Sequence, residues 1–134
     1  MSTEASTELP PVGALLGMRP VEFGDGFVAL DLDPAECHYS TGPAVHGGVL
    51  ATLLDSAMSL ALHSQLPAMT FASTLDLKVS YLRPVTVDTG TVHGEGKVLH
   101  KGRRVALTEG QVVDANGKLL AHATSTCLIR SAGT

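Results

Sequence analysis

The sequence lacks the positive charge that proteins binding nucleic acids or anionic membranes need. Its 9 lysines and arginines are outnumbered by 13 aspartates and glutamates, so the formal net charge is -4. No run rich in lysine or arginine restores a local positive field, and such a field drives association with nucleic acids and anionic membranes. We therefore expect neither kind of partner.

Cysteines and long hydrophobic runs are also scarce. The only two cysteines, Cys37 and Cys127, form no metal-ligand spacing with other cysteines or histidines, so we expect buried thiols and no metal site. The longest weakly polar stretch, residues 47–62, includes Asp55 and several hydroxyl groups and is too short for an ordinary membrane-spanning helix. No basic and then apolar leader opens the sequence. These absences favour a soluble protein of the reducing cytoplasm.

The composition that remains is that of one folded domain. The chain has 134 residues, of which 44% are hydrophobic and 16% charged, and its mean hydropathy is +0.22. These values exclude a disordered chain and suggest that apolar surface is buried between subunits. We expect residues 1–9, rich in Ser, Thr and Glu, to form a disordered tail and residues 10–134 to form the domain.

Hydrophobic periodicity predicts one long helix, a short one and a set of strands. The long helix covers residues 47–64, which contain no proline, and the short one covers residues 10–16, which start with Pro10-Pro11 and end at Gly17. Residues 33–45 have no regular pattern. Strands are expected at residues 19–23, 27–32, 75–81, 91–99, 105–113 and 119–129.

The long helix carries a narrow polar stripe on an otherwise apolar surface. Its members recur every three or four residues: Thr52, Asp55, Ser56, Ser59 and His63. At 100° per residue, Gly48 and Asp55 lie about 20° apart around the axis, and Ser59 lies about 40° beyond Asp55. Burying a carboxylate among leucines costs several kcal/mol unless it is hydrogen-bonded or protonated, so we expect Asp55 to have hydrogen-bond partners or a functional role.

The start of the same helix, His46-Gly47-Gly48, is a candidate anion or carbonyl site. Backbone N–H groups at a helix start have no partner within the helix, and glycine allows a ligand oxygen to approach them closely. The bland alternatives stay open at this point: the two glycines only start the helix, His46 only caps it, and Asp55 is a satisfied buried acid.

Two segments together resemble a known family. The segment His46-Gly47-Gly48-Val49-Leu50-Ala51-Thr52-Leu53-Leu54-Asp55 resembles the signature of hotdog-fold acyl-CoA thioesterases of the phenylacetic-acid-degradation (PaaI) type. Residues 77–84, Leu-Lys-Val-Ser-Tyr-Leu-Arg-Pro, resemble the strand that follows the helix in that family. The likeness extends from about Leu15 to Ile129.

The resemblance implies an α+β hotdog fold, in which an antiparallel sheet of five or six strands wraps a long central helix. It also implies a homodimer or homotetramer with active sites between subunits. In such enzymes the amide matching Gly47 polarises the thioester carbonyl, and the acid matching Asp55 acts as nucleophile or general base. By the same resemblance, His46 would hold the loop or the thioester and Gly48 would contact substrate. Ser59 would lie near the acid, and Ser73 or Thr74 would reach the site from the neighbouring subunit.

The chain departs from the family pattern before the histidine. Many relatives carry Asn or Gln where this chain has Ser40, and Gly where it has Pro43, and a hydroxyl cannot offer the donor and acceptor of an amide. Tyr39 and His38 are candidates to compensate, with a structural role as the alternative.

Coenzyme A would need cations for its phosphates, and the candidates are Arg83, Lys101, Arg103 and Arg104. The bland alternative is that these charges only solvate a turn. No nucleotide-binding glycine loop occurs, and no cofactor is implied, because coenzyme A is part of the substrate. The leading hypothesis is hydrolysis of a small, medium-chain or aromatic acyl-CoA. The rivals are a non-catalytic acyl-CoA binding or sensing module and a hotdog hydratase or dehydratase.

Overall fold

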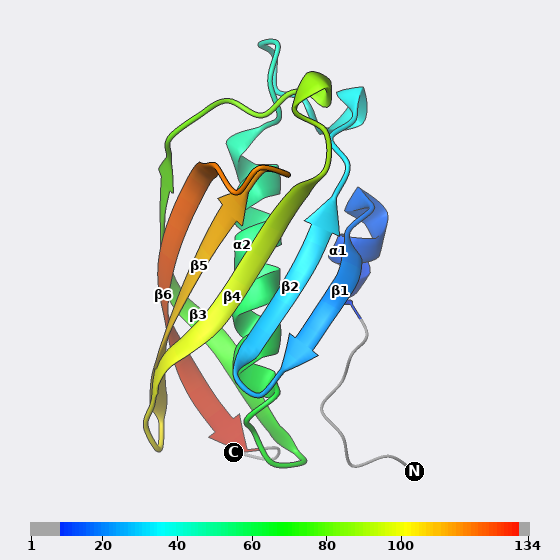
Figure 1. Ribbon diagram of the computed structural model, residues 1–134. Helices are drawn as coiled ribbons and strands as arrows, with labels where there is room; N and C mark the ends of the chain where they lie inside the picture. The colour runs from blue at the N-terminus through cyan, green and yellow to red at the C-terminus, as the bar shows by residue number, and fades with distance from the viewer. Residues whose placement is uncertain (1–8, 132–134) are drawn as a thin grey trace.

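A long helix and one curved sheet make up most of the structure, a computed structural model that describes residues 9–131 (Figure 1). The helices are α1 (Pro11–Leu16) and α2 (Gly47–His63), and the strands are β1 (Arg19–Gly24), β2 (Phe27–Leu32), β3 (Thr70–Tyr81), β4 (Val92–Lys101), β5 (Val105–Val113) and β6 (Leu119–Ser131). The six strands form one sheet in the order β1-β2-β4-β5-β6-β3, and every neighbouring pair is antiparallel. This confirms the expected α+β hotdog architecture and selects six strands over five.

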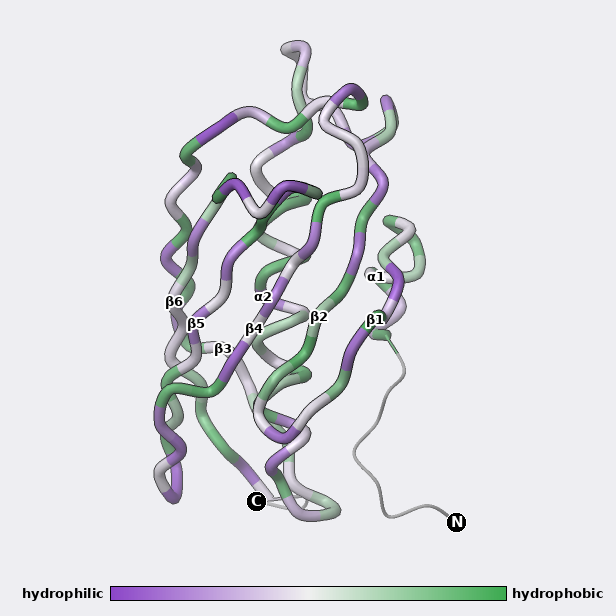
Figure 2. The backbone as a smooth tube through the Cα atoms, viewed as in Figure 1, coloured by the Kyte–Doolittle hydropathy of each residue, from purple (hydrophilic) through white to green (hydrophobic). Residues whose placement is uncertain are grey.

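The sheet wraps α2, which supplies much of the hydrophobic core (Figures 1 and 2). Buried α2 side chains such as Leu53, Leu54 and Met58 are fully shielded from solvent, and they pack against inward-facing residues of the sheet such as Val28 and Val112. Burying a side chain of this size stabilises the fold by about 1.5–3 kcal/mol. The apolar surface of α2 therefore holds the helix against the sheet, and the polar stripe lies outside this packing.

Glycines in β4 and β5 let α2 approach the sheet closely. A Cβ atom at Gly96 would lie 2.5 Å from the backbone of Ala57 and Met58, and one at Gly94 would lie 2.5 Å from Cγ of Leu53. The distance from a Cβ at Gly110 to Cγ of Met58 would be 3.0 Å. We call Gly94, Gly96 and Gly110 the glycine seam. It fixes how near the helix lies to the strands.

Strand β3 begins five residues before the predicted start at Leu75. Residues 70–74, Thr-Phe-Ala-Ser-Thr, show no alternation of polar and apolar side chains, yet they pair with β6 from Thr70 opposite Ser131 to Thr74 opposite Cys127. Pairing with a neighbouring strand, which periodicity does not report, overrides the weak local pattern.

The expected tail, residues 1–9, lies outside the described residues except for Leu9. Leu9 packs against the main hydrophobic core. The expected short helix is confirmed as α1, and Gly17 ends it in the left-handed conformation that glycine favours.

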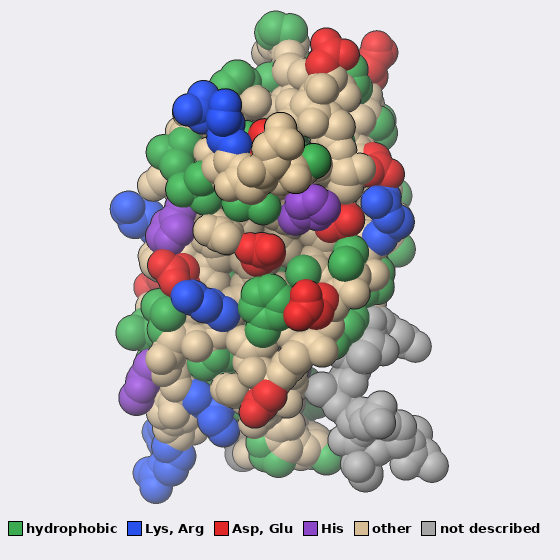
Figure 3. Space-filling model, in the orientation of Figure 1, with side chains coloured by type: hydrophobic (Ala, Val, Ile, Leu, Met, Phe, Trp, Pro, Cys, Tyr) green, Lys and Arg blue, Asp and Glu red, His purple; other side chains and the backbone are tan. Residues whose placement is uncertain are grey.

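The outer face of the sheet carries charged side chains of both signs (Figure 3). Glu109 lies 2.9 Å from His122 and 3.5 Å from Lys97, and its hydrogen bond with His122 is the main cause that lowers the pKa of its carboxyl. Gln111 donates a hydrogen bond to Glu95 across the neighbouring strand pair. A hollow of about 230 Å³ lies among these residues. Because its polar groups pair with one another, we regard it as part of the sheet surface.

Replacing Gly96 should test the close approach of α2 to the sheet. We expect Gly96→Ala to destabilise the folded protein by about 1–3 kcal/mol, because the new methyl group would meet helix backbone that cannot move aside. Urea denaturation at a fixed protein concentration measures the change. Gly24→Ala is the matched strand control, since its nearest neighbours would lie 3.7 Å away. An unchanged midpoint for Gly96→Ala would contradict the packing described here.

Candidate active site

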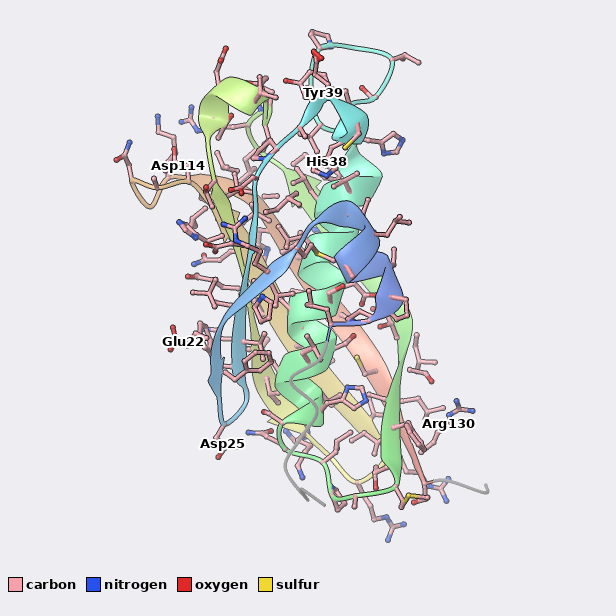
Figure 4. The ribbon with its side chains drawn as sticks, turned by 90° about the vertical axis from the view of Figure 1, so that its right-hand side faces the viewer. Glu22, Asp25, His38, Tyr39, Asp114 and Arg130 are labelled. Carbon is pink, nitrogen blue, oxygen red and sulfur yellow. The ribbon has the colours of Figure 1, made fainter. Side chains whose placement is uncertain are left out.

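The polar stripe of α2 lines an open groove of about 690 Å³. The groove lies on the side of α2 that the sheet leaves uncovered, between residues 9–12 and β3 (Figure 4). It is lined by Thr52, Asp55, Ser56, Ser59 and His63 of the stripe, by Ala51 and Leu60 of the same helix, by Leu77 of β3, and by Leu9, Pro10 and Val12. The five stripe residues therefore share one surface, as their spacing predicts.

Asp55 has a hydrogen-bond partner inside this chain. The Thr74 hydroxyl donates to Oδ1 of Asp55 over 2.9 Å. Thr74 thus contacts the acid within one chain, because β3 crosses beside the middle of α2; that it reaches the site of a neighbouring subunit stays a prediction. The carboxylate keeps its second oxygen for other partners, so this contact orients Asp55 without saturating it.

A bulge in β3 aims Thr74 at Asp55. Thr74 pairs with Cys127 and Asp76 with Thr126, so Leu75 is an extra residue in β3. The Leu75 side chain is 57% exposed, whereas strict alternation with Leu77 and Val79 predicts that it faces the helix. Asp76 Oδ1 accepts the Thr126 N–H at 3.1 Å, which gives that amide a partner at the irregular position. The extra residue puts a hydroxyl where an aliphatic side chain would otherwise be.

Ser73, the other candidate on this strand, is held elsewhere. Its hydroxyl accepts a hydrogen bond from Nη2 of Arg130 at 3.3 Å. Arg130 lies near the end of β6, and Figure 4 shows it far from the N-terminal end of α2. Sequence reasoning did not single out Arg130, because only the β3–β6 pairing brings it opposite this part of β3.

His46 caps α2, as one of the bland alternatives holds. Its ring Nδ1 accepts the Gly48 N–H at 2.7 Å, and the backbone N–H of His46 donates to the carbonyl of His38 at 2.8 Å. The Gly48 amide is therefore occupied, contrary to the expectation that it contacts substrate. The Gly47 N–H donates no hydrogen bond within residues 9–131, which leaves it as a free donor at this helix start.

Gly47 and Asp55 of one chain are too far apart to act on one carbonyl group. The angle of about 20° predicted around the axis holds for Gly48 and Asp55; Gly47 lies about 80° from Asp55 around the axis, and eight residues of helix separate the two by about 12 Å along it. A thioester carbonyl needs its polarising donor and its attacking group each within about 3 Å. A single chain thus offers two halves of a site on one surface.

The loop before α2 is held by its own hydrogen bonds. Ser40 Oγ accepts the Gly42 N–H at 3.2 Å and lies 3.4 Å from the Ala44 carbonyl that it donates to, so the hydroxyl serves its own turn. His38 is buried, with Nε2 on the Leu16 carbonyl, and Tyr39 Oη accepts the Val87 N–H (Figure 4). Both side chains thus bind backbone groups of this chain, as the structural alternative holds.

The four basic candidates lie at opposite ends of α2. Arg83 lines a hollow of about 380 Å³ together with Gly47 at the helix start. Lys101 donates to the carbonyl of Gln65 just beyond the helix end, and Arg103 and Arg104 follow it in the β4–β5 turn. A helix of 17 residues is about 25 Å long. One chain therefore does not gather the four cations into one site.

Three expectations, about the cysteines, a metal site and a membrane-spanning helix, can be compared with the structure. Cys127 is buried as predicted, but Cys37 is exposed, because it lies in a short 3-10 turn at the surface. Residues 9–131 contain no group of three or more His, Cys, Asp or Glu side chains that could hold a metal ion. In the same part of the chain, no helix has the length and apolar character needed to cross a membrane.

Comparisons with known proteins match this fold and this segment of the sequence. The sequence model of the family described as Thioesterase superfamily matches residues 42–121, which include α2 and β3. A Halobacterium salinarum protein named as a candidate esterase is 37% identical over 105 residues, which cover 75% of this chain and 68% of that protein. Among solved structures, a conserved protein of Pseudomonas aeruginosa is 34% identical with a TM-score of 0.85, covering 91% of this chain and 95% of that one. A variant of the phenylacetic acid degradation protein PaaI from Thermus thermophilus is 28% identical with a TM-score of 0.80, covering 89% and 98%.

The capping role of His46 predicts a loss of stability when its ring is removed. We expect His46→Ala to destabilise the fold by about 1 kcal/mol, since Gly48 loses the acceptor for its N–H. His100→Ala is a suitable control, because His100 is exposed and its ring makes no hydrogen bond within the described part of the chain. Urea denaturation measures both variants. If the two lose the same small amount, His46 is not an effective cap.

Proposed function

The chain belongs to the thioesterase superfamily, and from this membership we propose that it hydrolyses an acyl-CoA thioester to the free acid and coenzyme A. The acyl group is small, medium-chain or aromatic. The observation that carries the proposal is the Asp55 carboxylate, which lies in an open groove on an otherwise apolar helix and is oriented by the Thr74 hydroxyl. The two unpaired cysteines fit a reducing compartment, and we propose the cytoplasm.

Asp55 can act in either of two ways. As a general base it removes a proton from water, the oxygen attacks the carbonyl carbon, and the C–S bond breaks as the thiolate takes up the proton. As a nucleophile it attacks the carbonyl carbon itself, releases the thiolate and forms an anhydride that water then opens. Both routes give the same products and both need a donor for the carbonyl oxygen. The free Gly47 N–H supports that role.

A second copy of the chain would bring the two halves together. If a two-fold axis passes beside Ala51, the two α2 helices run antiparallel, and Gly47 of each chain lies opposite Asp55 of the other. Ala51 suits this position, because it lies halfway between the two residues, is small and lines the groove. Strand β3 pairs only with β6 among the described residues, and its exposed Phe71 and Leu75 side chains suit burial against a partner. We therefore propose a homodimer as the active unit, alone or within a homotetramer.

The proposed two-fold symmetry would also bring together the cations expected to bind coenzyme A. Antiparallel helices would bring Arg83 of one chain to the same end of the pair as Lys101, Arg103 and Arg104 of the other. Together these cations could pair with the phosphates of coenzyme A, whereas in one chain they lie apart.

A thiol-release assay tests the proposed function. The panel contains phenylacetyl-, benzoyl-, short-chain and long-chain acyl-CoAs, and its profile identifies the acyl class. Because Cys37 is exposed, a disulfide reagent that detects coenzyme A would also react with the protein, and Cys37→Ser removes this background. Binding of the thioesters without release of coenzyme A would favour a sensing module. Loss or addition of water on an unsaturated acyl group would favour a hydratase.

Asp55→Asn separates a catalytic acid from a structural one. The amide keeps the size of the carboxylate but loses its negative charge and its ability to take a proton, so we expect kcat to fall about 10²-fold or more. Binding of acyl-CoA should survive. The control is Asp25→Asn, in the exposed β1–β2 turn (Figure 4). An Asp55→Asn protein that assembles and hydrolyses its best substrate at nearly the wild-type rate would remove Asp55 from the reaction.

Ala51→Arg tests the proposed axis. Two arginines facing each other there would repel one another and separate the helices, so we expect monomers without thioesterase activity. Light scattering after gel filtration, run beside the activity assay, measures both properties. Ala115→Arg, in the exposed β5–β6 turn, controls for the added charge. A wild-type protein that is active as a monomer at micromolar concentration would contradict the shared site.

A further inference from the structure

We propose that Tyr81 is a positioning residue that holds the Gly47 peptide and so aims the Gly47 N–H at the substrate carbonyl. The inference rests on the proposed function, because it assigns a residue to the carbonyl-binding half of that site. Tyr81 is the last residue of β3, and sequence reasoning assigned it only a place in the strand.

A hydrogen bond and the packing of the ring both show that Tyr81 is in close contact with Gly47. Oη of Tyr81 donates a hydrogen bond to the Gly47 carbonyl over 2.6 Å. A Cβ atom at Gly47 would lie 3.0 Å from Cζ and 3.1 Å from Oη of the same ring, which is tighter than ordinary van der Waals contact. The ring thus occupies the space beside Gly47, and glycine at this position is what allows the hydroxyl to reach the backbone.

Tyr81 and His46 hold opposite ends of one peptide unit. The carbonyl of Gly47 and the N–H of Gly48 belong to the same planar group. Tyr81 binds the carbonyl oxygen, and Nδ1 of His46 accepts the N–H over 2.7 Å. The Gly47 N–H belongs to the preceding peptide, which joins this plane at the Gly47 Cα, so a plane held at both ends restricts the rotations that would reorient that N–H.

The surroundings of Gly47 leave its N–H as the donor for a ligand. The backbone N–H of His46 donates to the His38 carbonyl, and the backbone N–H of Val49 donates to the His46 carbonyl, so these neighbouring backbone groups already have partners. Gly47, Tyr81 and Arg83 line the same hollow of about 380 Å³. A substrate carbonyl entering this hollow therefore meets an amide that Val49 and Tyr81 hold from its two sides.

The Tyr81 hydroxyl keeps its proton under ordinary conditions. Burial raises the pKa of the Tyr81 phenol above its usual value, so the group remains a hydrogen-bond donor through neutral and mildly alkaline pH. This matters because the Gly47 carbonyl can only accept, and a phenolate would repel it.

The two tyrosines of the chain provide a matched pair of variants. Tyr81→Phe removes the hydroxyl that binds the Gly47 carbonyl and keeps the ring. Tyr39→Phe removes a hydroxyl that accepts the Val87 N–H at 2.8 Å, which is also a contact to backbone but not to Gly47. We expect Tyr81→Phe to lower kcat about tenfold and to raise KM by no more than about threefold, since an indirect loss should cost less than deleting a carbonyl donor outright. Tyr39→Phe should leave both constants near the wild-type values.

Affinity for an uncleavable substrate analogue provides a readout that needs no turnover. In a ketone analogue of the best-bound acyl-CoA, a methylene group replaces the sulfur, and the carbonyl can still accept the Gly47 N–H. Titration calorimetry should show at least about threefold weaker binding to Tyr81→Phe than to the wild type or Tyr39→Phe.

The outcomes separate this inference from the proposed function. A wild-type protein that releases no coenzyme A, but whose Tyr81→Phe variant binds the ketone more weakly, would overturn the hydrolase proposal and retain the role of Tyr81 toward the carbonyl. Normal hydrolysis with equal kcat and equal ketone affinity in Tyr81→Phe and Tyr39→Phe would overturn the role of Tyr81 alone. A protein that neither hydrolyses nor binds these compounds would overturn both.

Discussion

The arrangement of this protein depends on the need to place a carboxylate on a helix that is otherwise buried. Most of the surface of α2 is held against the sheet, and the glycine seam lets the backbone of the helix come close to β4 and β5. Only a narrow stripe is left uncovered, and Asp55 lies on it. An acidic side chain there is tolerated because it borders an open groove and accepts a hydrogen bond from the Thr74 hydroxyl. The close packing of the helix and the exposure of its acid are two results of the same geometry.

A straight helix also imposes a separation that one chain cannot overcome. Its first residue and its central acid lie about 80° apart around the axis and about two turns, or 12 Å, apart along it. No rotation of side chains closes this distance, since Gly47 has none and Asp55 is short. Symmetry offers the simplest solution, because an antiparallel copy reverses the order of the two groups. The exposed edge of β3 and the small Ala51 suit such a pairing.

The sequence allowed the helix, most strands and the polar stripe to be predicted, because each follows from residue spacing along one element. Thr52, Asp55, Ser56, Ser59 and His63 line one groove for this reason. Contacts between elements could not be predicted in the same way. The Thr74–Asp55 bond depends on an extra residue in β3, and the Arg130–Ser73 contact depends on strand register. The occupied amide of Gly48 depends on the rotamer of His46, which spacing does not report.

The bulge at Leu75 makes the identity of the group beside Asp55 depend on where β3 holds its extra residue. If the extra residue lay before Thr74 instead of after it, the regular alternation from Leu77 would turn the Leu75 side chain toward the carboxylate and carry the Thr74 hydroxyl to the opposite face. A shift of the bulge along the strand would thus exchange the neighbour of the acid without replacing Thr74 or Asp55. When homologous chains are aligned, the position of a one-residue gap in this edge strand consequently carries information about chemistry.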